Sequence, residues 1–139
     1  MTNLQRLFEV GQSPWMDYIR RDIVLDGQLQ DLIGRGIRGM TSNPTIFDKA
    51  VEGTGIYDDD IARLAAEGKE LEDIFLELAR FDIQSAAELF SPLHADSERT
   101  DGYVSFEVSP FLARDTVATC DKARLLWKTI NRPNLMVKI

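Results

Sequence analysis

The clearest candidate for chemistry is Lys138, the only charged residue in the most strand-like stretch of the chain, residues 134–139. The apolar residues around it show no alternation, which is typical of a strand covered on both faces in a parallel sheet. A desolvated lysine favours its neutral amine, which can attack a carbonyl and form a Schiff base. The alternative is a lysine at a strand end whose long stem carries the ammonium to water.

Two carboxylates have similar places in other apolar runs. Asp17 interrupts the run from Trp15 to Ile19, and Glu107 lies near the end of the run 103–108. A buried aspartate needs hydrogen-bond donors or a cation, so Asp17 is either a structural acceptor or a site residue.

A third polar group is Thr41-Ser42-Asn43, which stands before Pro44. It follows a short strand pattern over 37–40 and precedes a helical pattern over 45–50. Such residues cap helices, and they also bind ligands; their spacing does not separate the two roles.

The elements that position these residues alternate along the chain. Strand patterns at 15–19, 37–40, 103–108 and 134–139 alternate with helical patterns at 3–10, 26–35, 45–50 and 115–130. Residues 53–98 lack strand signals and predict an insertion of about three helices, with breaks at Gly68 and at Phe81-Asp82, where Asp82 would be an N-cap. Pro92 is expected to end this helical insertion. Four strands separated by helices predict a parallel α/β fold in a single domain.

The composition limits the classes of partner and of catalytic group that the chain can use. A chain of 139 residues with 44% apolar residues can bury a core, and its net charge of −7 argues against nucleic acid or an acidic membrane as partner. One cysteine allows no internal disulfide, which suits the cytoplasm, and no leader or membrane span is apparent. The single histidine, His94, has no partner for a metal site and is expected to have a surface or capping role. Any catalysis by this chain is therefore expected to use carboxylates and lysine.

Four motifs in order resemble the transaldolases in their longer bacterial form: GQSPWMDYI, IRGMTSNPTIF, DGYVSFEVSP and RPNLMVKI. The resemblance implies a (β/α)8 TIM barrel that uses no cofactor and no metal. It also implies transfer of a dihydroxyacetone unit between sugar phosphates of the pentose phosphate pathway, such as sedoheptulose 7-phosphate and fructose 6-phosphate.

By the same resemblance, Lys138 matches the Schiff-base lysine and Asp17 the carboxylate that handles the proton of the sugar C4 hydroxyl. Glu107 matches the acid/base that works through a catalytic water, and Asn43 and Thr41 match the substrate-binding asparagine and its neighbouring threonine. The related fructose-6-phosphate aldolases carry glutamine at the place of Glu107, so transaldolase is the better fit.

The chain departs from this family in length, since such enzymes are more than twice as long. Residues 1–139 therefore correspond to the N-terminal half of the barrel, with four parallel strands and the helical insertion at 53–98 between the second and third. The groups that grip the substrate phosphate lie in the missing half, so the 139 residues alone are expected to be inactive. An alternative is a non-catalytic half barrel that associates with itself through its open edges.

Overall fold

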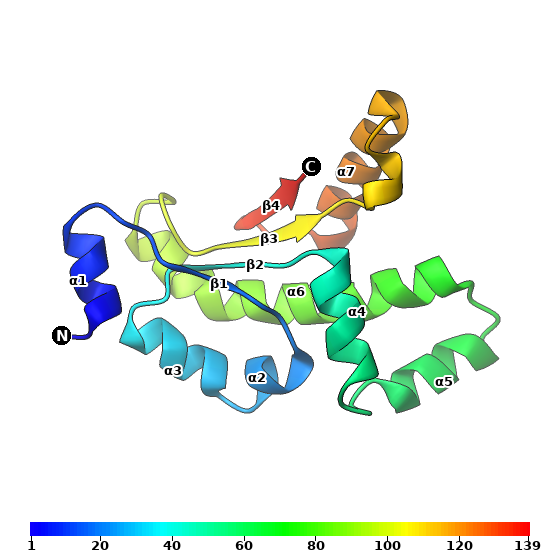
Figure 1. The fold of residues 1–139 in the computed structure, drawn as a ribbon, viewed down its shortest axis with the longest axis horizontal. Helices are drawn as coiled ribbons and strands as arrows, with labels where there is room; N and C mark the ends of the chain where they lie inside the picture. Colours follow the sequence, from blue (N-terminus) through cyan, green and yellow to red (C-terminus); the bar gives the residue numbers. More distant parts are fainter.

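The computed structural model describes residues 1–139 and contains a single four-stranded sheet. The strands follow the order β1-β2-β3-β4, and every neighbouring pair is parallel (Figure 1). Their bounds are β1 (Trp15–Asp17), β2 (Gly39–Thr41), β3 (Tyr103–Glu107) and β4 (Leu135–Lys138). Each strand overlaps its predicted segment. The α/β prediction is confirmed, and this strand order is that of one half of a (β/α)8 barrel.

The chain also forms seven α-helices and one 3₁₀ turn. They are α1 (Asn3–Glu9), α2 (Arg21–Leu25), α3 (Gln28–Arg35), α4 (Pro44–Glu52), α5 (Asp58–Ala66), α6 (Leu71–Asp96), η1 (Pro110–Leu112) and α7 (Thr116–Ile130). Short α2 was not predicted, because its five residues are too few to show a helical period. None of the helices combines the length and apolar character needed to cross a bilayer.

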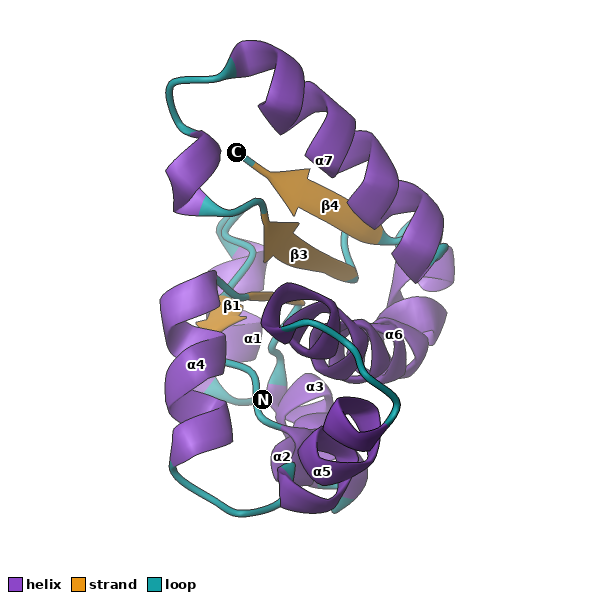
Figure 2. Ribbon diagram, turned by 90° about the vertical axis from the view of Figure 1, so that its right-hand side faces the viewer, coloured by secondary structure: helices purple, strands orange, loops and turns teal.

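One face of the sheet forms the core with the helices. Met16, Met40, Val104 and Leu135 occupy one register level, and the last three are buried. Helix α6 packs on β3 and helix α7 on β4, whereas α2 and α3 pack on each other and on α6 (Figures 1 and 2). Because side chains alternate along a strand, the neighbouring residues in each strand point to the opposite face.

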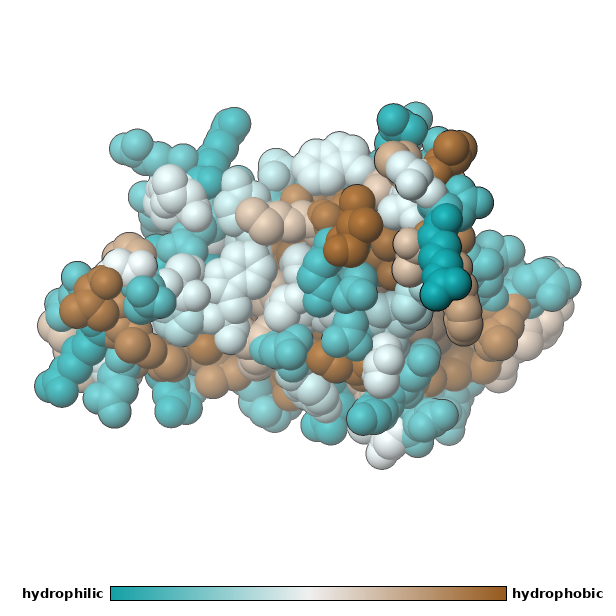
Figure 3. All heavy atoms as spheres, turned by 45° about the horizontal axis from the view of Figure 1, so that its top comes forward, coloured by the Kyte–Doolittle hydropathy of each residue, from teal (hydrophilic) through white to brown (hydrophobic).

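That opposite face is largely open. Met136, whose side chain lies on this face, is 42% exposed. Figure 3, a view from the upper side of Figure 1, shows apolar groups lying open among hydrophilic ones. The prediction that residues 134–139 are covered on both faces is therefore wrong for these 139 residues. β4 is an edge strand with α7 on one side only, and no further strand pairs with it.

The long helix α6 corrects the predicted break at Phe81-Asp82. It runs without interruption from Leu71 to Asp96, so Asp82 is a mid-helix residue and not an N-cap. Pro92 lies inside its last turns and does not end it. Because Pro92 has no backbone N–H, only the helical hydrogen bond to the Glu88 carbonyl is lost. Glu88 is an exposed residue.

His94, near the end of α6, is buried, which corrects the expectation of a surface role. Its Nδ1 lies 2.8 Å from the Asp101 carbonyl oxygen, and its ring packs edge-on against Tyr103. The histidine thus fixes the turn between α6 and β3. Gly102 is needed there, because its φ is +74° and a Cβ would lie 2.5 Å from the His94 backbone nitrogen.

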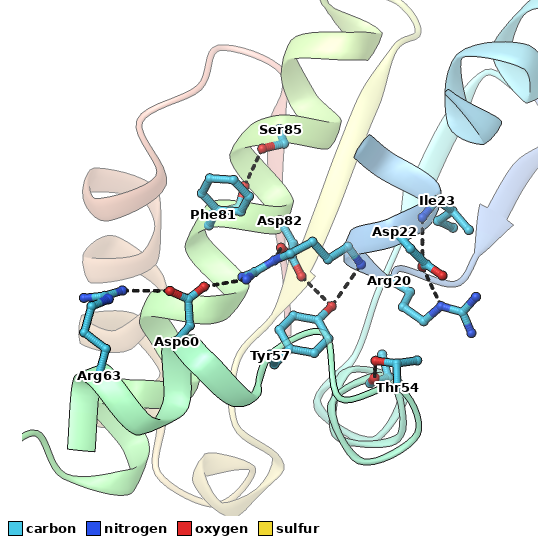
Figure 4. Close-up of polar contacts among 12 residues, drawn as sticks. Arg20, Asp22, Ile23, Thr54, Tyr57, Asp60, Arg63, Phe81, Asp82 and Ser85 are labelled. Carbon is cyan, nitrogen blue, oxygen red and sulfur yellow. Dashed lines mark hydrogen bonds and ion pairs between the residues drawn. The ribbon is translucent and has the colours of Figure 1, made fainter. Parts of the chain in front are cut away.

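Asp82 is buried because it is the centre of a polar cluster made by Arg21, Tyr57, Asp60 and Asp82 (Figure 4). Arg21 Nε donates to Asp82 Oδ1 at 2.7 Å, and the Tyr57 hydroxyl donates to Asp82 Oδ2 at 2.7 Å. The same hydroxyl accepts the Arg21 backbone N–H at 2.9 Å, while Arg21 Nη1 reaches Asp60 at 2.6 Å. The cluster ties the start of α2 to the two insertion helices α5 and α6.

Burial raises the pKa of two members of this cluster, Asp82 and Tyr57. Burial raises the pKa of the Asp82 carboxyl, against the opposing effect of its hydrogen bonds from Arg21 and Tyr57. Burial and the adjacent carboxylate raise the pKa of the Tyr57 hydroxyl, so Tyr57 remains a protonated donor.

Asp82→Ala should therefore lower the free energy of unfolding by about 3 to 5 kcal/mol, because it leaves the buried Arg21 guanidinium without its main partner. Urea unfolding followed by circular dichroism at one fixed protein concentration measures this loss. Asp121→Ala is the matched control, since it breaks an exposed pair with Arg124 worth less than about 1 kcal/mol. Equal losses in the two variants would show that the cluster carries no special stability.

Candidate active site

Four of the five predicted site residues end the four strands. Asp17 and Thr41 are the last residues of β1 and β2, and Glu107 and Lys138 are the last residues of β3 and β4. Asp17 pairs in register with Thr41, Thr41 with Ser105, and Glu107 with Lys138. The register therefore places all of them on the open face, at the carboxyl end of the parallel sheet. Sites of (β/α)8 barrels are built at this end.

The closest contact in this group joins Lys138 and Glu107. The Lys138 Nζ lies 2.9 Å from Glu107 Oε2, and the two side chains are 40% and 27% exposed. The same nitrogen lies 3.5 Å from the Thr41 hydroxyl oxygen. An amine, a carboxylate and a hydroxyl thus converge from three neighbouring strands on one accessible point. They form a nucleophile and a proton acceptor within direct reach of each other.

Asp17 stands apart from this pair. Its side chain is exposed, and its strand is three strands away from β4, about 14 Å at the usual strand spacing. A ligand must therefore lie between Asp17 and Lys138 to contact both. In a closed barrel, inward-pointing side chains converge on the axis, which shortens this separation.

Asn43 is an N-cap, and the structure shows how its side chain can also bind a substrate. Its Oδ1 accepts the Ile46 backbone N–H at 2.9 Å and so caps α4, which begins at Pro44. The backbone donor fixes which amide atom is the oxygen. The half-buried Asn43 side chain still offers an amide nitrogen with two donors. The two roles left open by the sequence are compatible in one residue.

Ser105 belongs to the same group and was not singled out from the sequence. Its hydroxyl lies 2.7 Å from the Thr41 hydroxyl, and its carbonyl oxygen accepts from the backbone and side chain of Ser42. The sequence could have indicated Ser105, because it stands two residues before Glu107 in one strand and the two side chains therefore share a face.

Trp15 lies at the amino end of the strands, opposite the polar strand ends. Its indole lies across Gly39 of the next strand, where a Cβ would come within 2.3 Å of the ring. The indole Nε1 donates to Ser13 at 3.0 Å, and Ser13 in turn donates to Asp101. Position 39 therefore requires glycine, because the Trp15 indole lies too close for a side chain there.

Nothing in this arrangement resembles a metal centre, since no three His, Cys, Asp or Glu side chains converge in a geometry that could hold an ion. The chemistry that these side chains can do themselves is amine attack on a carbonyl, with proton transfer by carboxylates.

Comparison with known proteins places this geometry in a family. Residues 14–139 match the profile described as "Transaldolase/Fructose-6-phosphate aldolase". The chain is 44% identical over 138 residues to "Transaldolase 2" of Nostoc punctiforme, which covers 99% of this chain and 36% of that protein. It is 46% identical over 131 residues to "Transaldolase" of Thiobacillus denitrificans, covering 94% and 36%. The chain therefore spans about a third of the length of these relatives.

Proposed function

The chain belongs to the transaldolase/fructose-6-phosphate aldolase family, and from this premise we propose that it supplies the first four strands of a transaldolase barrel. The complete barrel, in which these residues are followed by the remaining strand and helix units, would transfer a dihydroxyacetone unit between sugar phosphates. Its reaction would convert sedoheptulose 7-phosphate and glyceraldehyde 3-phosphate to erythrose 4-phosphate and fructose 6-phosphate. We propose that it acts in the pentose phosphate pathway, in the cytoplasm.

The observation that carries the proposal is the Lys138–Glu107 pair on the open face. In the first step an ammonium gives up its proton, and the Lys138 nitrogen attacks the ketone carbon of the donor sugar. Glu107, 2.9 Å away, is the nearest proton acceptor. The resulting carbinolamine loses its hydroxyl as water when Glu107 returns a proton through a water molecule, and the C=N bond forms.

Carbon-carbon cleavage then needs a second base. Asp17 takes the proton of the C4 hydroxyl, the C3–C4 bond breaks, and its electron pair enters the imine to give an enamine on Lys138. The aldose product leaves, and the enamine carbon adds to the aldehyde carbon of the acceptor in the reverse sense. Hydrolysis of the new imine frees the product and the lysine. Asn43 and Thr41 would hold the dihydroxyacetone unit, and no cofactor or metal enters.

The test is to incubate the complete barrel with fructose 6-phosphate, with and without erythrose 4-phosphate. A transaldolase consumes fructose 6-phosphate only when the acceptor is present and then forms sedoheptulose 7-phosphate. Release of free dihydroxyacetone without an acceptor would instead indicate an aldolase. Glu107 favours transfer, because the resemblance gives the fructose-6-phosphate aldolases glutamine at this place.

A second candidate rests on the open face and the free edge of β4, where Met136 is exposed. A chain limited to these 139 residues would be a non-catalytic half barrel that associates with itself, because a free edge strand and an open apolar face favour pairing with another copy.

The 139-residue chain should accordingly exceed the monomer mass in light scattering at micromolar concentration. Met136→Lys should shift the distribution toward monomer, because it places a charge on the open face beside the edge. Val10→Lys changes a residue that is equally apolar and even more exposed, but lies at the end of α1, and should leave the mass unchanged. A compact monomer in the unaltered chain would contradict this prediction.

A further inference from the structure

The hydroxyl of Thr41 lies at the centre of the site, and its hydrogen bonds determine what it offers to a substrate. A threonine hydroxyl has one proton to donate and two lone pairs that accept. Two groups face its oxygen: the Ser105 Oγ of the neighbouring strand β3 at 2.7 Å, and the Lys138 Nζ of β4, the strand beyond it, at 3.5 Å.

The direction of each hydrogen bond follows from the chemistry of the partners. A lysine ammonium has no acceptor, so Thr41 must accept from Lys138. Ser105 is buried, and the oxygen of Thr41 is the only acceptor within hydrogen-bond reach of its hydroxyl. Since a buried donor is nearly always satisfied, Ser105 donates and Thr41 accepts again.

Both lone pairs of Thr41 are thereby used by the protein. Its own proton is not used by any group in the chain, and the half-buried side chain lies on the open face of the sheet. The proton is left to donate to an oxygen that enters from that face.

We infer that Ser105 is a positioning residue that fixes Thr41 as a hydrogen-bond donor toward a substrate oxygen next to Lys138. This inference deepens the proposed function and rests on it. Ser105 does not itself touch the substrate in this arrangement, because its hydroxyl is buried behind Thr41.

The backbone around Ser105 is suited to this task. Its carbonyl oxygen accepts from both the N–H and the hydroxyl of Ser42, each at 3.2 Å. Ser42 follows Thr41 directly, so β2 and β3 are locked together at the level of the two hydroxyls. The Ser105–Thr41 hydrogen bond is thus held from the backbone side as well.

The experiment uses the complete barrel and the variants Ser105→Ala, Ser105→Thr, Thr41→Val and the double variant Ser105→Ala/Thr41→Val. Ser105→Ala should lower kcat/KM for fructose 6-phosphate about tenfold, as expected for a lost hydrogen bond at a reacting site. Ser105→Thr keeps a hydroxyl on the same carbon, so it should restore most of the activity. In the Thr41→Val background, removal of the Ser105 hydroxyl should have no further effect.

Ser85→Ala is the matched control, because the Ser85 hydroxyl donates only to the Phe81 carbonyl of its own helix (Figure 4). It should change neither kcat/KM nor the melting temperature. If the Ser105 hydroxyl acted independently of Thr41, the Ser105→Ala and Thr41→Val losses would instead add up in the double variant, and the inference would be overturned.

A second measurement separates this inference from the proposed function. The NMR order parameter of the Thr41 methyl group should fall in Ser105→Ala and stay unchanged in Ser85→Ala, because Thr41 loses the partner that fixes its rotamer. This readout decides the inference even if the unaltered barrel transfers no dihydroxyacetone, which would refute only the proposed function. An unchanged order parameter together with unchanged kcat/KM would refute the role of Ser105.

Discussion

Lys138→Met should abolish transfer by the complete barrel, with a loss of at least about 10⁴-fold in turnover, the scale on which covalent nucleophiles contribute. Methionine keeps an unbranched stem and removes only the amine that would form the imine. With fructose 6-phosphate and borohydride, the unaltered protein should gain one reduced dihydroxyacetone unit, and the modified peptide should contain Lys138. The variant should gain none.

Lys122→Met is the matched control. Lys122 is also paired with a carboxylate, Glu72, at 2.5 Å, but it lies on α7 away from the open face. Its replacement should leave both turnover and labelling intact. If borohydride labelled another lysine, or if Lys138→Met were still labelled, the Schiff-base role of Lys138 would be refuted.

The four strands could be predicted from the sequence because each is an apolar run bounded by turn residues, whereas their order followed from the resemblance to a (β/α)8 barrel. The same patterns place Asp17, Thr41, Glu107 and Lys138 at strand ends, where parallel strands bring them to one edge. Distance along the chain does not matter to this inference, since the sheet topology alone makes residues 17 and 138 members of one face.

What could not be predicted depends on contacts between distant segments. Asp82 was interpreted as an N-cap because an aspartate in a helical stretch is usually explained locally, yet its partners are Arg21 and Tyr57, 61 and 25 residues away. The covering of β4 is also a tertiary property. An apolar run shows that a strand can be buried, but whether both faces are covered depends on which other elements pack on it.

Asp17→Asn and Glu107→Gln should separate the two carboxylates by the step at which each acts. Both variants should lose turnover by about 10²- to 10⁴-fold, the usual contribution of one general acid or base. Glu107 lies 2.9 Å from the amine, so its loss should slow imine formation, and borohydride trapping should become slower. Asp17 lies three strands away, so Asp17→Asn should form the imine at the unaltered rate and accumulate it before cleavage.

The contrast between the two trapping rates carries more information than the loss of turnover, because a general loss of fold would slow both steps together. Glu72→Gln and Asp121→Asn are suitable controls: each alters an exposed carboxylate that pairs with a cation outside the site, and each should leave both rates unchanged. If both site variants trapped substrate at the unaltered rate and kept their turnover, Asp17 and Glu107 would be structural acceptors. If Asp17→Asn slowed trapping as much as Glu107→Gln, the distance between β1 and β4 would not divide the proton transfers as proposed. Asp17 would then have to reach the imine nitrogen, which requires the sheet to curve far more strongly in the complete barrel than it does in residues 1–139.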